Sequence, residues 1–432
     1  MGAGKGVGRR DLSRREFVGR ALSLGIVGAA GAALGPPLVV PRVAAWASDR
    51  IQPAQRARAW IVNAGSPVIE ATFEQPSTIG RAIVSLPLFN VKGFPYYARG
   101  DGSADDGPPI QAAINDAAAA GGGIVYLPPG TFLLANVQEQ YGVRFYLLDY
   151  YSGVHIVGAG RHVSMLVARP GLPDQTRIIS AHSADRTSLV SGNLFQDFTV
   201  QGNAARQPDA GSMVGISNVN TDSVHHVRMR VESIKATAAS EGACYDSYDS
   251  MRNGYRDCEA VQDGIGSLTG SGFSATRSTA TSYQHCRAAG SGKWMGFTTF
   301  LSSKIEYRDC SGFANGQRGL NCERSEAVRY LDCRAGGRTT GNRGDGIYLY
   351  QSLDVEVTDC RSQGNQSGLV NNGSTLRVIR GQYTDNADAG LAFSSDADWA
   401  NSSLEEAPAI SGNARAPIAV SGLLLTTSSA SQ

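Results

Sequence analysis

The stretch GIYLYQSLDVEVTDC (346–360) decides the fold of this chain. Ile347 and Leu349 alternate with tyrosines, and Val355 and Val357 alternate with acidic residues. Because successive side chains of a strand point to opposite faces, this period of two predicts short β-strands. The opening glycine, a serine six residues later and a cysteine fourteen residues later recur in other parts of the chain.

This pattern is repeated about seven times, at intervals from 22 residues (368 after 346) to 29 residues (244 after 215). The copies start at Gly215, Cys244, Gly272, Gly296, Gly319, Gly346 and Gly368. A repeat of this length is one supersecondary unit that stacks on its neighbours. The predicted fold is therefore all-β, a single-stranded right-handed parallel β-helix in which each repeat is one coil of three short strands.

Five of the seven cysteines occupy the same position of the repeat: Cys258, Cys286, Cys310, Cys333 and Cys360. We interpret them as an inward column of small apolar side chains. Metal ligands or disulfides are the alternative, but the chain has no CxxC pair. Parallel stacking also points neighbouring Cβ vectors the same way, which disfavours disulfides. An odd number of cysteines leaves at least one of them free.

Charge and the N-terminal segment bear on partners and location. The formal net charge is +1 and 18% of the residues are charged, without a basic run, so a nucleic-acid partner is not expected. Arg14 and Arg15 precede the apolar stretch 21–40, and Ala45-Trp46-Ala47 forms a small-x-small cleavage pattern. This resembles a twin-arginine signal cleaved before Ser48. We expect a secreted, periplasmic or cell-surface protein without stable membrane insertion.

The expected boundaries follow from these features. Residues 1–47 form the signal peptide, 48–90 a lead-in segment, 91–400 the β-helix, and 401–432 a partial coil with a loose tail.

Two segments before the repeats carry a family resemblance. GDGSADDGPPIQAAI (100–114) and GGGIVYLPPG (121–130) resemble the N-terminal cap of the pectate-lyase-like β-helix superfamily. The resemblance implies an amphipathic capping helix that begins near Ile110 and covers the open end of the solenoid. Asp105 and Asp106 then lie at a helix N-terminus, where acids are stabilising, so we interpret them as structural.

The order of segments is most similar to the catalytic module of mannuronan C5-epimerases. GVHIVGAG (153–160) and LFQDFTVQGN (194–203) continue the resemblance, and the catalytic segment of that family falls on ACYDSYDS (243–250). Asp246 matches the family aspartate. Tyr248 stands where the family has histidine, and Ala243 where it has tyrosine.

The resemblance makes Asp246 and Tyr248 candidate catalytic residues. Tyr245 replaces the family tyrosine if the chain is locally shifted, and is a candidate substrate-binding residue. Asp246 and Asp249 are candidate ligands for Ca²⁺.

Alternation also identifies an outward face on the first strand of each coil. Its candidate substrate-binding residues are Phe300, Glu323, Tyr348 and Tyr350, and the turns leading into it add Lys293, Arg318 and Arg343. Aromatic rings stack on sugar faces, carboxylates bind hydroxyls or move protons, and arginines bind carboxylates as a fork. A local ion pair between Arg318 and Asp345 is the alternative role of that arginine.

Together these residues favour an acidic, uronate-containing polysaccharide as partner. Removal of the C5 proton, by a lyase or an epimerase, needs a base and a group that neutralises the uronate carboxylate. A glycoside hydrolase of polygalacturonase type is an alternative, because Asp345-Gly346-Ile347 resembles part of the Asn-Thr-Asp-Gly element of those enzymes. A non-catalytic glycan-binding or surface solenoid is the other alternative.

Overall fold

The computed structural model describes residues 58–61, 69–72, 86–140, 144–182, 188–237, 242–264, 267–394, 402–420 and 423–425. The expected signal peptide and most of the lead-in segment lie outside these residues. The chain divides into two compact units, and the larger one comprises Ala59–Glu70 and Arg81–Gln432. The strands β1 (Arg58–Ile61) and β2 (Ile69–Thr72) pair with each other.

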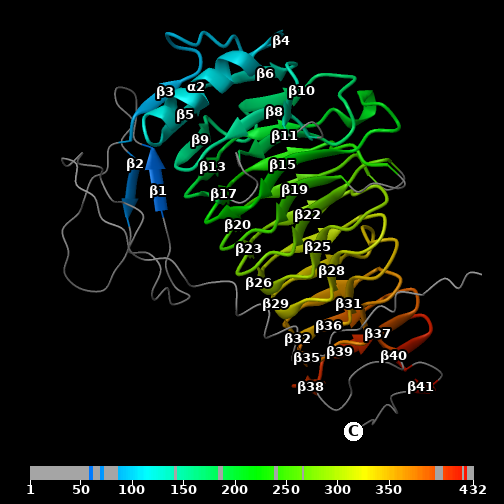
Figure 1. The fold of residues 1–432 in the computed structure, drawn as a ribbon. Helices are drawn as coiled ribbons and strands as arrows, with labels where there is room; N and C mark the ends of the chain where they lie inside the picture. The colour runs from blue at the N-terminus through cyan, green and yellow to red at the C-terminus, as the bar shows by residue number, and fades with distance from the viewer. Residues whose placement is uncertain are drawn as a thin grey trace, which may run out of the picture. The chain divides into compact units, whose positions relative to one another are not determined.

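Three long sheets form the rest of the described chain (Figure 1). Sheet I contains β3 (Leu88–Asn90), β5 (Gly123–Leu127), β9 (Val154–Gly158), β13 (Leu194–Gln196), β17 (His225–Val227), β20 (Gly254–Arg256), β23 (Ser282–Gln284), β26 (Ser303–Arg308), β29 (Glu326–Leu331), β32 (Leu353–Thr358), β35 (Leu376–Ile379) and β38 (Ser403–Glu405). Sheet II contains β4 (Asp101–Asp105), β6 (Gly130–Leu134), β10 (Ser164–Ala168), β14 (Thr199–Gln201), β18 (Arg230–Glu232), β21 (Glu259–Val261), β24 (Arg287–Ala289), β27 (Ser311–Phe313), β30 (Arg334–Gly336), β33 (Arg361–Gln363), β36 (Gln382–Thr384) and β39 (Ala409–Ser411).

Sheet III contains β7 (Gln138–Gln140), β8 (Arg144–Tyr150), β11 (Thr176–Ala181), β15 (Met213–Val219), β19 (Ala243–Tyr248), β22 (Ser271–Thr276), β25 (Phe297–Phe300), β28 (Leu320–Glu323), β31 (Ile347–Tyr350), β34 (Leu369–Asn372), β37 (Ala389–Phe393), β40 (Ala416–Val420) and β41 (Leu423–Leu425). From β9 to β40 each coil contributes one strand to each sheet, and neighbouring coils pair in parallel, as β28 does with β31. At the two ends of sheet III, β7 and β41 pair antiparallel with β8 and β40. The architecture is mostly β, as predicted, with long parallel sheets. β12 (Val190–Ser191) and β16 (Thr221–Asp222) form a short extra pair, and η1 (Ala204–Arg206) is a single 3₁₀ turn.

The register of sheet III agrees with the alignment of the repeats. Leu320 pairs with Ile347, which places Gly319 beside Gly346. The repeated serine explains part of this regularity, because its Oγ accepts a hydrogen bond from the backbone N–H of the preceding coil. The N···O distances are 3.0 Å from Ser278 to Ser302, 3.1 Å from Ser302 to Ser325 and 3.2 Å from Ser325 to Ser352. The serine column is therefore a hydrogen-bonded ladder between coils.

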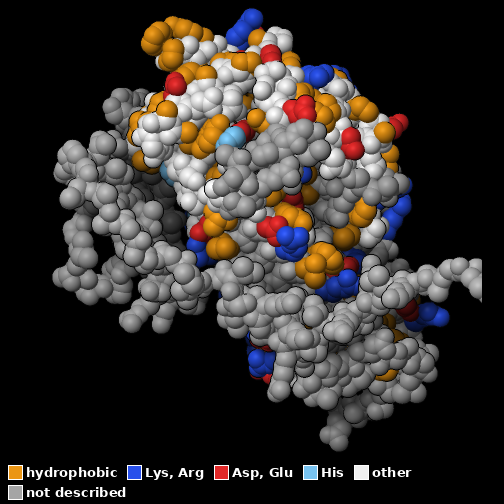
Figure 2. Space-filling model, in the orientation of Figure 1, with side chains coloured by type: hydrophobic (Ala, Val, Ile, Leu, Met, Phe, Trp, Pro, Cys, Tyr) orange, Lys and Arg blue, Asp and Glu red, His pale blue; other side chains and the backbone are white. Residues whose placement is uncertain are grey.

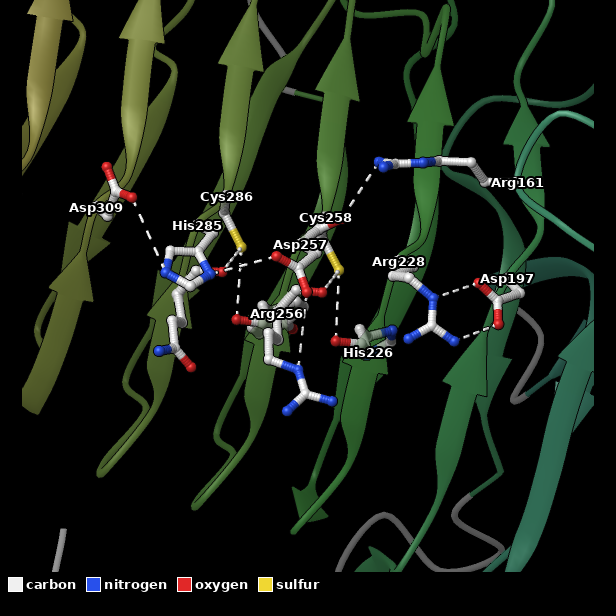
Figure 3. A network of polar contacts seen from close by, with 12 residues as sticks. Arg161, Asp197, His226, Arg228, Arg256, Asp257, Cys258, His285, Cys286 and Asp309 are labelled. Atoms are coloured by element: carbon white, nitrogen blue, oxygen red, sulfur yellow. Dashed lines mark hydrogen bonds and ion pairs between the residues drawn. The ribbon is translucent and has the colours of Figure 1, made fainter. Parts of the chain in front are cut away.

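The cysteine column lies inside the coil, as predicted. All seven cysteines are buried and free. The Sγ of Cys258 contacts the carbonyls of His226 and Arg256, and Cys286 repeats this contact one coil later with Tyr255 and Gln284 (Figure 3). The thiols thus donate weak hydrogen bonds to the backbone.

Stacked aromatic rings fill the core beside sheet I. Phe195, His226, Tyr255, Tyr283, Tyr307 and Tyr330 stack in register, with centroids 4.7–5.0 Å apart. Burial lowers the pKa of His226 to about 3, so this imidazole is neutral and packs as a ring.

Helix α2 (Gly107–Ala119) precedes the repeats and packs on β3, β5 and β8 (Figure 1). Its buried face includes Ile110 and Ile114, four residues apart. The Asp106 carboxylate accepts hydrogen bonds from the N–H groups of Arg99 and Gly100 at 2.6 and 2.9 Å. Asp106 thus has a structural role, as predicted, but its side chain holds the backbone before the helix and makes no capping hydrogen bond to α2. Within the described residues, no helix has the length and apolar character needed to cross a membrane.

Candidate functional site

The outer face of sheet III carries two ladders of side chains. The first ladder contains Ser217, Asp246, Ser274, Thr298, Asn321, Tyr348 and Val370. The second ladder contains Val219, Tyr248, Thr276, Phe300, Glu323, Tyr350 and Asn372. In the view of Figure 2, acidic and basic side chains are interspersed on the described part of the surface.

Tyr248 lies on the second ladder with Arg277 against it. The Arg277 guanidinium donates a hydrogen bond of 2.9 Å to the Tyr248 hydroxyl and lies 4.9 Å from the centre of its ring. It also binds both carboxylate oxygens of Asp249, at 2.7 and 2.6 Å. Asp246 precedes Tyr248 by two residues and shares its outward face, half-buried. An aromatic hydroxyl, a fixed cation and a carboxylate are thus brought together.

The local backbone explains the position of Arg277. Asp249 and Arg277 both follow a sheet III strand and both have φ of +50°. The same left-handed turn occurs at Asn220, Leu301, Arg324 and Gln351 on other coils. It places their side chains at one edge of the outer face. Sequence reasoning missed Arg277, although its signal was present: a basic residue one place after the strand, one coil beyond Tyr248.

The predicted role of Tyr245 in substrate binding is wrong. Tyr245 is fully buried, its ring stacks on Phe273 at 4.6 Å, and its hydroxyl donates to the carbonyl of Glu259 at 3.2 Å. The physical reason is the period of two. Asp246 faces outward, so its neighbour faces the core, and Tyr245 is held there by its register with Phe273.

Asp249 does not join Asp246 in a ready metal site. Its carboxylate is neutralised by Arg277 through two short hydrogen bonds. In the part of the chain that the structure describes, no group of three His, Cys, Asp or Glu side chains is arranged to hold a metal ion. Binding of Ca²⁺ at Asp246 and Asp249 stays a prediction, and it would require Arg277 to leave Asp249.

A second cluster lies three coils further along and is centred on Arg318. Its guanidinium donates to Asn321 at 2.8 Å and to Glu323 at 3.2 Å, and lies 3.4 Å from the centre of the Tyr348 ring. Its Nε is 4.0 Å from the carboxylate of Asp345. We call these five residues the Arg318 cluster. The local ion pair expected as the alternative role of Arg318 is therefore present, with Glu323 beside Asp345, whereas its role in substrate binding stays a prediction.

The sequence predicted Asp345 only as an ion-pair partner of Arg318 and as part of the hydrolase alternative, and not as a site residue of its own. Burial raises the pKa of Asp345 above its ordinary value, although Arg318 and Ser367 act in the opposite direction. Its sequence signal is its place directly before the glycine that starts a coil.

The remaining predicted residues border the same face. Phe300 and Tyr350 are half-buried on the second ladder, and the Arg324 guanidinium lies 5.8 Å from the Tyr350 ring. Lys293 and Arg343 are exposed on the turns that lead into sheet III. Arg343 lines an open hollow of about 450 Å³ together with Asn342, Gln366, Asp388 and Arg415. Cationic side chains therefore occur along both edges of the outer face.

The two clusters are separate. Asp246 and Asn321 occupy the same ladder with two residues between them. Three steps of a sheet correspond to about 14 Å. Contact with both clusters at once requires an extended ligand that lies along the coils.

Comparisons with known proteins place this face in context. A model of the protein family described as "Rhamnogalacturonase A/epimerase, pectate lyase-like" matches residues 88–312, more than half of the chain. Mannuronan C5-epimerase AlgE2 of Azotobacter vinelandii is 38% identical over 131 residues, which is 30% of this chain and 12% of the relative. Alginate lyase 7 of the same organism is 36% identical over 116 residues, 27% of this chain and 13% of the relative. The chain thus spans a small part of these relatives.

Solved structures show the same fold. The A-module of mannuronan C-5 epimerase AlgE6 from Azotobacter vinelandii superposes with a TM-score of 0.62 at 22% identity. That match covers 78% of this chain and 96% of the A-module. The AlgE4 A-module from the same organism gives a TM-score of 0.57 at 20% identity and covers 79% of this chain and 98% of that one.

Proposed function

Because the chain belongs to the rhamnogalacturonase A/epimerase, pectate lyase-like family, we propose that it removes the C5 proton of a uronate-containing polysaccharide as an epimerase or lyase. The names of its relatives, mannuronan C5-epimerases and an alginate lyase, support this class of substrate. The observation that carries the proposal is the contact between Tyr248 and Arg277, which lies within the matched residues.

The chemistry assigns each residue of this group a part. A base must take the C5 proton, and the electron pair left at C5 is delocalised into the adjacent carboxyl group. Tyr248 is our candidate base, since a charge-assisted hydrogen bond from Arg277 stabilises negative charge on its oxygen. In this proposal Asp246, beside it on the face, binds sugar hydroxyls.

The carbanion-like intermediate formed by loss of the C5 proton can give two products. If a proton returns to C5 from the opposite side of the ring, the configuration is inverted. If the C4–O bond breaks instead, its oxygen leaves with the bonding pair and a C4–C5 double bond forms. The Tyr248–Arg277 pair serves both outcomes.

The rest of the outer face would bind further sugar residues. The Arg318 cluster offers a ring and a guanidinium about 14 Å from Asp246. In this proposal α2 caps the N-terminal end of a right-handed solenoid, and the twin-arginine-like segment exports the folded chain. Dependence on Ca²⁺ is part of the test below.

The test is incubation of the full chain with polymannuronate, polyguluronate and polygalacturonate, each with Ca²⁺ or with a chelator. Proton NMR reads C5 inversion, ultraviolet absorbance reads unsaturated ends, and a reducing-sugar assay reads chain cleavage. We expect inversion or unsaturated ends, and loss of either in Tyr248→Phe. Absence of all three signals on every polymer would overturn the proposal.

A hydrolase is the second candidate, favoured by the Arg318 cluster. Glu323 and Asp345 are two carboxylates that approach the same guanidinium, and the raised pKa of Asp345 suits a proton donor. Reducing ends without unsaturated product, lost in Asp345→Asn and Glu323→Gln but kept in Tyr248→Phe, would establish this candidate in place of the first.

A further inference from the structure

A second acid–base pair, Asp149 and His182, lies at sheet III on coils that precede those of Asp246 and Tyr248. His182 Nδ1 is 2.5 Å from Asp149 Oδ2. The Asp149 side chain is only 5% exposed, whereas that of His182 is 29% exposed. Gln111 of α2 holds the Asp149 backbone, donating to its carbonyl at 3.0 Å and accepting from its N–H at 2.9 Å. The backbone of Asp149 is thus fixed, and its Oδ2 orients an accessible imidazole.

The other ring nitrogen of His182 remains available. Since a carboxylate only accepts, Nδ1 is the protonated nitrogen in this contact. Among the described residues, Nε2 of His182 has no hydrogen-bond partner. The Tyr151 ring lies 4.6 Å from the imidazole on the side of the preceding coil. A carboxylate on Nδ1 and a ring on one side are the arrangement that presents Nε2 for proton transfer.

The register brings this pair into line with Tyr248. Ser180 pairs with Ser217, and Ser217 pairs with Asp246. Continuing these pairs by two residues places His182 beside Val219, and Val219 pairs with Tyr248. His182 and Tyr248 thus belong to the second ladder, two coils apart, which corresponds to about 10 Å.

His182 and Tyr248 are supported in corresponding ways on the two sides of Val219. Val219, a small half-buried apolar side chain, is the floor between His182 and Tyr248. Asp149 supports His182 from one coil further out on one side. Arg277 supports Tyr248 from one coil further out on the other side. An anion thus contacts the imidazole at one end, and a cation contacts the phenol at the other.

We propose that His182 is a second catalytic residue that faces Tyr248 across a sugar ring seated on Val219, and that the reaction is therefore C5 epimerisation. The inference rests on the proposed function. Tyr248 takes the C5 proton from one side of the ring, and the electron pair moves into the carboxyl group. The Nε2–H of His182 gives a proton to C5 from the other side. His182 ends neutral and Tyr248 protonated, and exchange of one proton each with solvent restores both.

The test follows two signals from the same uronate polymer in D₂O: inversion at C5, and exchange of the C5 proton for deuterium. The variants are His182→Gln and Tyr248→Phe, with His285→Gln as the matched control. His285 lies on the turn between sheets I and II, 3.3 Å from Asp257 (Figure 3). Melting temperatures of all four proteins establish that the variants fold.

We expect His182→Gln to lose inversion about 100-fold or more while it still exchanges the C5 proton, because Tyr248 then returns the proton to the side it came from. Tyr248→Phe loses both signals, and His285→Gln keeps both. Inversion by His182→Gln at the wild-type rate would overturn the inference, as would a folded wild type that only eliminates. A wild type that neither inverts nor eliminates overturns the proposed function as well.

Discussion

Arg277 reaches back one coil to bind Tyr248 and Asp249 at once, with a hydrogen bond of 2.9 Å to the phenolic oxygen and two to the carboxylate. One guanidinium therefore positions the candidate base and is itself positioned by an acid. Because these contacts lie at the surface, they contribute little to stability, about 0–1 kcal/mol for the ion pair. Their main effect is on the chemistry at Tyr248.

Arg277→Gln is accordingly expected to lower kcat about 100-fold and to leave KM and the melting temperature nearly unchanged. The readout is initial rate against polymer concentration. Arg252→Gln is the matched control, because Arg252 binds Asp222 at a turn away from Tyr248. Equal losses in the two variants would contradict a specific role of Arg277.

Arg318 should act on binding of the polymer. Arg318→Gln removes the guanidinium that lies on the Tyr348 ring and leaves Glu323 without its cation. We expect KM for the polymer to rise about tenfold, the effect of one charged hydrogen bond, with kcat less affected. A fall in kcat with unchanged KM would instead point to the hydrolase chemistry described above.

Asp149 predicts a pH-dependent stability. Burial raises its pKa to about 6 from 3.8, with His182 opposing. The folded state therefore holds this proton more tightly than the unfolded state, so the stabilisation is complete below about pH 4 and is lost as the pH rises through 6. Relative to Asp149→Asn, the wild type should lose up to about 3 kcal/mol between these values.

The measurement for Asp149 is urea unfolding of both proteins at pH 4, 5, 6 and 7. Asp332→Asn, at an exposed turn, is the control substitution. A difference between Asp149→Asn and wild type that does not change with pH would show that folding leaves the pKa of Asp149 unshifted.

The serine ladder predicts that loss of one of its buried hydrogen bonds lowers the free energy of unfolding. Ser325→Ala removes the acceptor of the Ser302 N–H, which is buried. A buried donor without a partner costs about 1–3 kcal/mol, so the free energy of unfolding should fall by that amount. Ser282→Ala, an exposed serine of β23, should change it by less than about 0.5 kcal/mol. Equal effects of the two substitutions would contradict the ladder.

Burial of the cysteine side chains predicts that they are protected from alkylation in the folded protein. All seven are buried, and burial raises the pKa of the Cys286 and Cys360 thiols. We expect a thiol reagent to modify none of them in the native protein and all seven after denaturation. Rapid modification of the native protein would show that the coils open locally.

The sequence predicted the residues that recur from coil to coil, and it missed functional residues that lie outside the repeated pattern. The spacing of glycine, serine and cysteine gave the register of the coils, and alternation gave the outward position of Asp246 and Tyr248. The same alternation excludes Tyr245, which family resemblance had suggested. Arg277 was missed because a left-handed turn, and not the strand pattern, directs its side chain. Asp149 and His182 were missed because their coils lie before the aligned repeats.

The serine ladder also has a direction. The acceptor for a coil's backbone N–H is supplied by the coil that follows it, and the asparagines Asn342, Asn365 and Asn386 repeat this relation on another turn. Each ladder side chain therefore completes the hydrogen bonding of the coil before it. Replacement of a ladder serine or asparagine leaves an unpaired N–H in the preceding coil, on its N-terminal side, and not in the coil that carries the substitution.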